Sequence, residues 1–349
     1  MAALLATALS GRACAQSIGA NFSGINLAIG KQLINNANGY APPDNDGAVG
    51  PNHVAQLING GFAVFNKSGT AVKLESGRQF WMDAGLPDPG NSLGNLGVFN
   101  QRILYDPTAG QWIAAALTGD TTDNKVLIAR SETSDPTGPW KAVSFVANAG
   151  GPDKFADFTT LGVDAKGVYV TTNNYPSLTD GGFDSVSVFS LPKTDLLQST
   201  PSLARLSRFD ALDSSLGTTL QAVTSFGPAT STTPILATFP INGSNFVLRS
   251  DLSGTAGAGA TITTDPTLIT TSAYNNPPAA AQPDGTRSIS TIDSRITSNV
   301  YEVNGLMYGA CCNVADWLKL SFPPNAALKK HWLELPAPAP SNASVTEPS

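Results

Sequence analysis

The sequence has little charge and very few cysteines or histidines. Only 13% of its 349 residues are Asp, Glu, Lys or Arg, and the net charge is −6. Nucleic-acid-binding domains normally carry a basic patch or stripe, so DNA and RNA are not expected partners, and neither are anionic membrane surfaces. With three cysteines and two histidines, and no second CxxC or CxxH pair, the sequence does not predict a structural zinc site.

Long apolar runs and long helical patterns are missing as well. The run Ala2 to Leu9 is far too short to span a bilayer. It is followed by Ala13-Cys14-Ala15 before Gln16, which has the small-x-small form of a secretory cleavage site. We therefore expect residues 1–15 to be a secretion leader and the protein to be secreted or periplasmic. The usual basic segment is absent, so the alternative is an apolar N-terminal strand.

Glycine and proline, in contrast, are abundant, with 33 and 25 copies. Three segments read as turns in which an Asp opens the reversal, a Gly supplies backbone freedom and an aromatic residue starts the next apolar run. They are Asp106 to Trp112 (DPTAGQW), Ser134 to Trp140 (SDPTGPW) and Asp164 to Tyr169 (DAKGVY). The Asp residues at 106, 135 and 164 are evenly spaced. The pattern predicts a repeated β-hairpin.

The chain divides into four parts by composition. We expect a leader at 1–15, an N-terminal arm at 16–41, one β domain at 42–335 and a disordered Pro/Ala/Ser tail at 336–349. A long loop is predicted from Phe80 to Val98. Predicted strands include 53–65, 70–74, 185–191, 218–226, 234–239, 246–252 and 288–308, one poor edge strand within 253–283, and last strands at 317–322 and 330–335.

Many short antiparallel strands at regular spacing are typical of a β-propeller built of four-stranded blades. The domain would hold about five blades at a repeat of roughly 50 residues, with six or seven as alternatives. A two-sheet sandwich is the second choice. A closed propeller has no free sheet edges, so we expect a monomer.

The turn SDPTGPW, preceded by the strand Val126 to Ala129, resembles the SxSPTGPW-type turn of five-bladed propeller glycosidases of the arabinanase, xylosidase and fructanase kind. It also resembles a loosened Asp-box of sialidases, with one residue too many between Asp135 and Gly138. As an ordered set, PPDNDGAVGPNHV, RILYDPTAGQW and TIDSRITSNVYEVNGLMY resemble an uncharacterised family of secreted bacterial propeller-like proteins, which has no established activity.

The glycosidase resemblance implies two carboxyl groups across a sugar and a third that tunes their pKa values, on innermost strands around a central channel. Asp44 and Asp46 fall where the base of such enzymes lies. Asp157 enters a middle strand, and Glu302 ends a late one, so Asp46, Asp157 and Glu302 are the candidate catalytic residues. The chain departs from the family because it has no clear Glu-Gly-Pro acid motif. Each carboxylate is also explained by a turn-capping or surface role.

Substrate contacts are predicted for polar residues beside apolar runs, because such groups are costly to bury without a partner. The candidates are His53, Arg102, Arg295, Asn173 and Tyr301. In the sialidase variant, Arg102 and Arg295 would belong to an arginine cluster and Tyr301 would be the nucleophile.

The alternative function is a non-catalytic propeller that binds glycans or cell-surface partners. Aromatic rings and neutral amides would then suffice. Trp81, Phe99, Tyr175 and the pair Asn173-Asn174 are the candidates.

Other motifs have simpler explanations. Asp44-Asn45-Asp46-Gly47 opens like a calcium loop at Asp44 and Asp46, but the later EF-hand positions are absent and a turn suffices, so no cofactor is predicted. Gly90 to Gly94 matches GxSxG, yet Pro87 and Pro89 precede it where a nucleophile elbow needs a strand. Cys311 and Cys312 are adjacent and read either as two buried apolar residues or as a vicinal disulfide.

Overall fold

The structure is a computed structural model. It describes residues 20–90, 96–119, 124–147, 154–177, 182–239, 243–254, 259–281, 285, 288–289, 291 and 293–309. The predicted leader, most of the GxSxG motif, both cysteines of the vicinal pair, the two last predicted strands and the tail lie outside the described residues.

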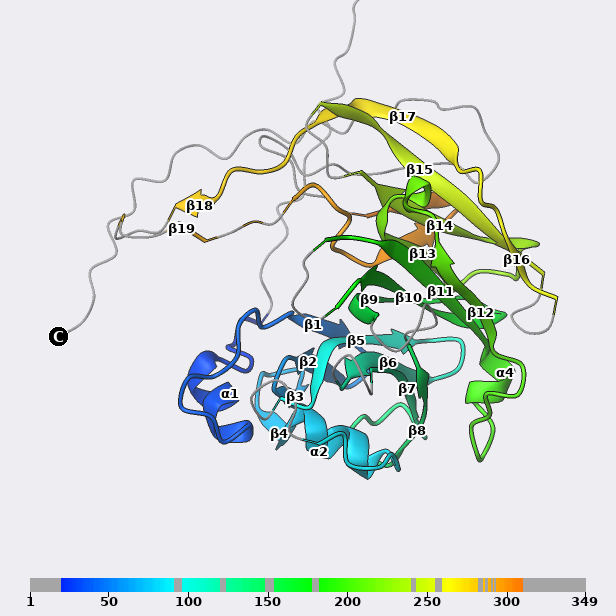
Figure 1. The fold of residues 1–349 in the computed structure, drawn as a ribbon. Helices are drawn as coiled ribbons and strands as arrows, with labels where there is room; N and C mark the ends of the chain where they lie inside the picture. Colours follow the sequence, from blue (N-terminus) through cyan, green and yellow to red (C-terminus); the bar gives the residue numbers. More distant parts are fainter. Residues whose placement is uncertain are drawn as a thin grey trace, which may run out of the picture.

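Three consecutive stretches of chain fold into the same antiparallel, four-stranded, up-and-down sheet (Figure 1). The first sheet holds β1 (Asp46–Val49), β2 (His53–Ile58), β3 (Gly61–Asn66) and β4 (Ala71–Glu75). The second holds β5 (Val98–Asp106), β6 (Gln111–Thr118), β7 (Lys125–Ser131) and β8 (Trp140–Val146). The third holds β9 (Phe155–Val163), β10 (Gly167–Tyr175), β11 (Ser185–Pro192) and β12 (Ser207–Leu212).

The fourth sheet is less regular. Its core is β13 (Thr218–Ser225), β14 (Thr232–Thr238) and β15 (Ser244–Ser253), and β15 then pairs with both β16 (Thr261–Ile262) and β17 (Thr267–Tyr274). The hairpin of β20 (Val300–Val303) and β21 (Leu306–Tyr308) joins through a parallel pairing of β20 with β13. A separate two-stranded sheet holds β18 (Ala280–Ala281) and β19 (Ser288–Ile289).

The first strands of successive sheets are neighbours. β1 contacts β5, β5 contacts β9, β9 contacts β13, and β13 pairs with β20. We call β1, β5, β9, β13 and β20 the inner strands. The prediction of a mostly β fold built from four-stranded sheets is confirmed, whereas the number of blades stays a prediction because the chain after residue 309 lies outside the described part.

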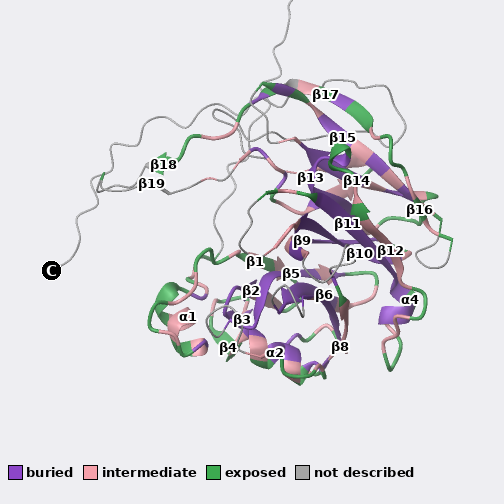
Figure 2. Cartoon of the chain, in the orientation of Figure 1, coloured by how far each residue is buried: buried purple, intermediate pink, exposed green. Residues whose placement is uncertain are grey.

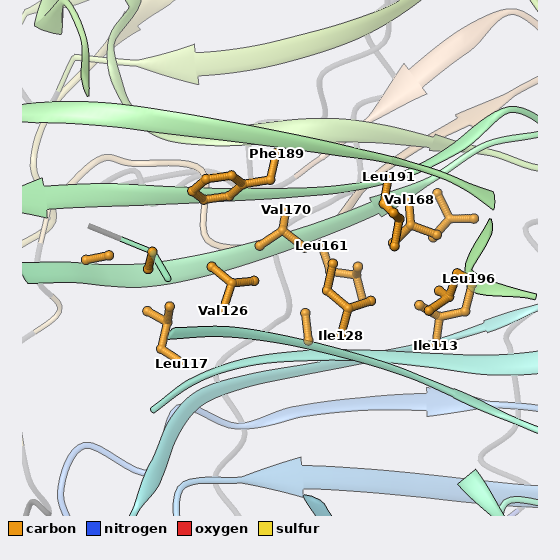
Figure 3. Packing of buried hydrophobic residues seen from close by; sticks show 14 of the residues in the cluster. Ile113, Leu117, Val126, Ile128, Leu161, Val168, Val170, Phe189, Leu191 and Leu196 are labelled. Atoms are coloured by element: carbon orange, nitrogen blue, oxygen red, sulfur yellow. The ribbon is translucent and has the colours of Figure 1, made fainter. Parts of the chain in front are cut away.

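The core lies between the sheets, which explains why the strands read as continuous apolar runs (Figure 2). Ile113 and Ile128 of the second sheet pack against Val170 and Phe189 of the third (Figure 3). Between the first and second sheets lie the large rings of Phe62, Phe80, Trp81, Trp112 and Trp140. Packing of this kind fixes the angle between sheets and therefore the places of their inner strands.

Helices are short. They are α1 (Leu27–Leu33), α2 (Gly77–Asp83), α4 (Lys193–Leu196) and the 3₁₀ turn η1 (Ser214–Leu216). Ser76 caps α2, because its Oγ accepts the N–H of Gln79 at 3.0 Å. The segment predicted as a loop from Phe80 therefore begins inside α2. Phe80 and Trp81 of this helix are buried in the core. No helix among the described residues is long and apolar enough to cross a membrane.

The three Asp-Gly turn motifs lie at hairpin turns, as predicted. They connect β5 to β6, β7 to β8 and β9 to β10. In each, the Asp side chain accepts main-chain N–H groups of the turn: Thr108 for Asp106 (2.8 Å), Thr137 for Asp135 (3.0 Å) and Lys166 for Asp164 (2.7 Å). The motifs therefore stabilise the fold.

Candidate functional site

Three inner strands are interrupted at the same place near their start. Asn100 in β5, Phe158 in β9 and Thr219 in β13 have φ values of 50°, 53° and 52°, and the strand register shifts at each. Asp44, just before β1, has a φ of 42°. Left-handed backbone is strained for Phe158 and Thr219 and is tolerated by Asn100 and Asp44. β-bulges of this kind occur beside functional sites, where they redirect side chains.

The residue two positions beyond each of these points takes part in a hydrogen bond between a side chain and the main chain of the next inner strand or, for Gln221, of Ile296 in the segment before β20. This places the starts of the inner strands next to one another on one face of the molecule, which we call the bulge face. The four bonds are Ile103 N to Asp46 Oδ2 (2.9 Å), Arg102 Nε to Thr159 O (2.8 Å), Thr160 Oγ1 to Leu220 O (2.8 Å) and Gln221 Nε2 to Ile296 O (2.9 Å).

Two carboxylates on the bulge face are joined by a chain of hydrogen bonds. Asn59 donates through Nδ2 to Asp44 Oδ2 at 2.7 Å and accepts the main-chain N–H of Asn100 at 2.8 Å. Asn100 in turn donates through Nδ2 to Asp157 Oδ1. Both asparagines are buried. Because buried amides hold fixed orientations, the chain sets the relative positions of Asp44 and Asp157 across three sheets.

Asp157 is half-buried at the start of β9. Burial raises the pKa of its carboxyl group, against the lowering effects of hydrogen bonds from Phe158 and Asn100 and of the Arg295 charge. Both hydrogen bonds reach Oδ1. Within the described part of the chain, Oδ2 has no hydrogen bond and no salt-bridge partner, so this oxygen is available to carry a proton.

Asp44 is also half-buried, and burial raises its pKa. The hydrogen bond from Asn59 and the charge of Arg102 lower it, whereas the charge of Asp157 raises it further. The two carboxylates therefore lie close enough to interact. Burial thus raises the pKa of both carboxyl groups. Two neighbouring carboxyl groups can serve acid and base catalysis when one keeps its proton and the other is ionised.

Asp46 has a different environment, because both of its oxygens are bonded to main-chain N–H groups. Oδ1 accepts Gly47 N and Oδ2 accepts Ile103 N, each at 2.9 Å. Burial raises its pKa, and the nearby charge of Arg102 and these two bonds oppose the shift. The side chain thus ties β1 to β5.

The two predicted arginines both lie on this face. Arg102 bonds to the third sheet through Nε, and its charge acts on both Asp44 and Asp46. Arg295 forms a two-pronged ion pair with Asp293, at 2.7 and 2.5 Å, and its guanidinium lies 4.3 Å from the centre of the Phe158 ring. Arg295 is therefore held from two sides.

Two predicted site residues lie elsewhere. His53 starts β2 at the opposite end of the β1–β2 hairpin, where its Nδ1 is 3.9 Å from Asp135 Oδ1. Glu302 pairs with Ser225 at the far end of β13, and its carboxylate accepts Ser225 Oγ and the N–H of Gly305, both at 2.5 Å. The structure does not bring either residue to Asp157, because both lie at the other ends of their strands.

Several side chains predicted to bind substrate already have partners within the protein. Asn173 is 1% exposed, and its amide accepts Thr219 N at 2.7 Å and donates to Thr219 Oγ1 at 2.9 Å. Trp81 and Phe99 belong to the core. Tyr175 and Tyr301 remain half-buried, and the charge of Asp46 adds to the effect of burial in raising the pKa of Tyr301.

Sequence reasoning missed Tyr40, Asn59 and Asn100. Tyr40 is half-buried, and burial, followed by the charges of Asp157 and Asp44, raises the pKa of its hydroxyl. The only signal for the two asparagines was a single amide at the edge of an apolar run. Such a residue usually reads as part of a turn.

A shallow hollow of about 360 Å³ adjoins this face. It lies between the N-terminal arm and the first sheet, with Phe22, Val54 and Phe65 among its walls and Asp46 at its edge. Asp44 and Asp157 do not line it. Among the described residues, no group of three His, Cys, Asp or Glu side chains is placed to hold a metal ion.

No protein-family model matches this chain, and no curated protein matches it. Solved structures do resemble it. A Bacillus subtilis arabinanase is 12% identical, with a TM-score of 0.37 over 80% of this chain and 91% of that one. A GH43_1 enzyme from Xanthomonas citri in complex with xylose is 7% identical, with a TM-score of 0.34 over 77% and 80%.

A subtype N11 neuraminidase-like protein of a flat-faced bat strain is 12% identical, with a TM-score of 0.38 over 79% of this chain and 71% of that one. The similarity is distant, so the chemistry of the bulge face has to follow from this chain's own residues.

Proposed function

We propose that the protein is a secreted, carbohydrate-active propeller that hydrolyses glycosidic bonds with Asp157 and Asp44. The observation that carries this proposal is the hydrogen-bonded chain from Asp44 through Asn59 and Asn100 to Asp157. It holds two carboxylates, neither of them in a salt bridge with another described residue, on one face of the inner strands. Buried carboxylates without a neutralising partner are costly for stability and are typical of active sites.

In this proposal Asp157 is the general acid. Its raised pKa favours the protonated form, and Oδ2, which has no hydrogen bond to a described residue, can present the proton to the glycosidic oxygen. As the bond between the anomeric carbon and that oxygen breaks, the proton of Asp157 moves to the leaving group. Burial raises the pKa of Asp44 as well, but the hydrogen bond from Asn59 and the charge of Arg102 oppose this shift, and ionised Asp44 takes a proton from the water that attacks the anomeric carbon.

Asp46 receives a positioning role instead of the catalytic role that the sequence favoured. The hydrogen bond from Ile103 N to its Oδ2 holds β1 against β5 and so helps to fix the segment that carries Asp44. Arg102 and Arg295 lie on the same face and are the candidates for substrate contact, whereas Tyr301 pairs with Thr224 near the far end of β13.

One observation favours the second candidate function, a propeller that binds glycans without cleaving them. The third carboxylate expected from the glycosidase resemblance, Glu302, lies at the far end of β13 in the turn with Gly305. A binding protein would need only the aromatic and polar groups of the bulge face.

Hydrolysis distinguishes the two functions. Purified full-length protein is incubated with a panel of plant and bacterial polysaccharides, and newly formed reducing ends are measured. We expect release from at least one polymer, loss of release in Asp157→Asn and Asp44→Asn, and full release in the matched control Asp135→Asn at the opposite end of the sheets. A folded protein that cleaves none of the polymers would exclude the hydrolase and leave the binding propeller.

Secretion is part of the proposal and rests on the Ala13-Cys14-Ala15 segment. Mass analysis of the N-terminus of protein recovered from the medium or periplasm should give a chain that begins at Gln16. An intact Met1 in a cytosolic pool would contradict it.

A further inference from the structure

The charges of the bulge face limit the kind of glycan that it can accept. Four carboxylates, those of Asp44, Asp46, Asp157 and Asp293, face two guanidinium groups, and that of Arg295 is already paired with Asp293. A sugar that carries a carboxylate or sulfate would approach the partly buried carboxylates of Asp44, Asp46 and Asp293 with little water to screen them, even while Asp157 holds its proton. A neutral sugar meets no such repulsion.

Two described tyrosines have hydroxyls that the charge of Asp157 reaches, and Tyr40 is the first. It lies at the end of the N-terminal arm, next to Pro42 and Pro43, whose carbonyl oxygens accept hydrogen bonds from Asn59 (3.0 Å from Nδ2 and 2.8 Å from the main-chain N). One side of the Tyr40 ring packs against the core cluster that contains Phe99 and Phe155. The ring is still partly exposed, and its hydroxyl lies near enough to Asp157 and Asp44 to sense their charges.

Tyr175 is the second ring. It pairs with Phe155 across the β9–β10 ladder, two residues beyond the pair of Asn173 with Asp157. Its ring meets the edge of Phe183, at a centroid distance of 6.5 Å and an interplanar angle of 74°. The other side is partly exposed, and its hydroxyl interacts with Arg295 and Asp157.

We infer that the bulge face binds a neutral glycan and that Tyr40 and Tyr175 are its sugar-contacting rings. Each ring packs on apolar neighbours and is partly exposed, and each carries a hydroxyl that the charge of Asp157 reaches. This suits a sugar unit, whose C–H faces pack on rings and whose hydroxyls need polar partners. The inference rests on the proposed function for the place of the site, but it concerns binding and does not require cleavage.

The test measures binding in the Asp157→Asn background, which prevents turnover. Affinity electrophoresis is run in native gels that contain arabinan, xylan, β-1,3-galactan or polygalacturonate. We expect retardation by at least one of the three neutral polymers and none by polygalacturonate. Adding Tyr175→Ala or Tyr40→Leu should weaken binding about tenfold, as expected for the loss of a ring contact. Leucine is used at position 40 because it preserves the apolar packing.

Controls separate loss of binding from loss of folding. Tyr40→Phe keeps the ring and should bind within about twofold of its parent, and all variants should keep the melting temperature of the parent within a few degrees. Tyr105→Ala removes a half-buried tyrosine at the opposite end of β5, where it packs on Trp112, and should leave binding unchanged. Equal losses in Tyr105→Ala and Tyr40→Leu, or binding of polygalacturonate as strong as that of the neutral polymers, would overturn the inference.

This experiment can fail independently of the proposed hydrolysis. A wild-type protein that binds a neutral polymer through both tyrosines but cleaves nothing would disprove the hydrolase and leave the inference standing. A wild-type protein that cleaves polygalacturonate would support the hydrolase and disprove the inference.

Discussion

The two ends of the inner strands hold the same residue type in opposite states. At the end with the turn motifs, Asp106 is fully buried and forms an ion pair with the buried Lys193. On the bulge face, Asp157 is half-buried and has no salt-bridge partner among the described residues. Burial of a carboxylate therefore does not by itself mark a site. What distinguishes the two is whether the negative charge is compensated.

At the end with the turn motifs, the ion pair of Asp106 and Lys193 belongs to a network of hydrogen bonds that connects two sheets. Lys193 also donates to Thr108 Oγ1 at 2.9 Å and to Asp164 O at 3.0 Å, and thereby links the first hairpin turns of the second and third sheets. Asp164 in turn accepts the Tyr169 hydroxyl at 2.9 Å. Every one of these groups bonds to protein, so the cluster contributes to stability and has no reactive group to offer a substrate.

The largest effect is expected for a substitution on the bulge face, at Asp157. Asp157→Asn should reduce hydrolysis by roughly 10²- to 10⁴-fold, the usual contribution of a general acid, while the melting temperature stays close to that of the wild type. The amide keeps the shape of the side chain and an oxygen for Phe158 and Asn100, but it cannot deliver a proton. Turnover of the best polymer and a thermal melt check both parts. A large loss of stability would mean that Asp157 is structural.

The pH dependence of stability sharpens this result. Because folding raises the pKa of Asp157 above its ordinary value of 3.8, the ionised form is the one that folding disfavours. The contribution of Asp157 to stability is complete below pH 3.8 and is lost as the pH rises through the higher pKa of the folded protein. Relative to the wild type, Asp157→Asn should thus become more stable as pH increases over this window. Urea unfolding at a series of pH values tests this, and a difference that is flat or of opposite sign would contradict it.

Substitutions in the buried ion pair of Lys193 and Asp106 should change stability and leave activity unchanged. Lys193→Met leaves the charge of Asp106 buried without a partner and should cost about 3–5 kcal/mol in the free energy of unfolding. Binding and hydrolysis by the protein that remains folded should not change. The double variant Lys193→Met, Asp106→Asn is the control, since removal of both charges should restore part of the loss. If the single variant is as stable as the wild type, the contrast between the two ends does not hold.

A smaller effect is expected at Asp46, which lies on the bulge face but is saturated by main-chain N–H groups. Asp46→Asn places an amide NH₂ against one of these donors, Gly47 N or Ile103 N, and should lower the free energy of unfolding by about 1–3 kcal/mol. Asp44→Asn should mainly lower activity. Parallel measurement of unfolding and turnover in the two variants decides which aspartate is catalytic, and a reversed pattern would return that role to Asp46.

The smallest effect concerns the exposed turn motif. Asp135→Ala removes the bonds to the main chain and side chain of Thr137, at 3.0 and 2.7 Å, and should cost about 1 kcal/mol of stability. Turnover should be unaffected, because the turn lies at the opposite end of the sheets. Denaturant titration together with an activity assay provides the check.

Local sequence patterns predicted the hairpins and the turn motifs, and they named Asp46, His53, Arg102, Asp157 and Arg295 as candidate site residues. They did not reveal at which end of its strand each residue lies. His53 follows Asp46 closely in sequence, yet the β1–β2 hairpin reverses the chain between them and places them at opposite ends. Apolar periodicity carries no such information, because it is the same whichever way a strand runs.

Contacts between residues far apart in the chain were the second feature that could not be predicted from the sequence. The role of Asn59 depends on Asn100, which lies in another sheet 41 residues along the chain. The strand Asp46–Val49 was missed as well, because its four residues, DGAV, lack an apolar run. In both cases the residue or segment is defined by what packs beside it, which a single sequence does not display.

The bonds that join each inner strand to the next have a consequence for how such a chain changes over time. In all four, a side chain reaches a main-chain atom, Ile103 N, Thr159 O, Leu220 O or Ile296 O. A main-chain partner is present almost whatever side chain the receiving residue carries. Neighbouring sheets can therefore diverge in sequence without compensating changes across their border, and a sheet gained by duplication needs to bring only its own bulge and one polar residue two positions beyond it.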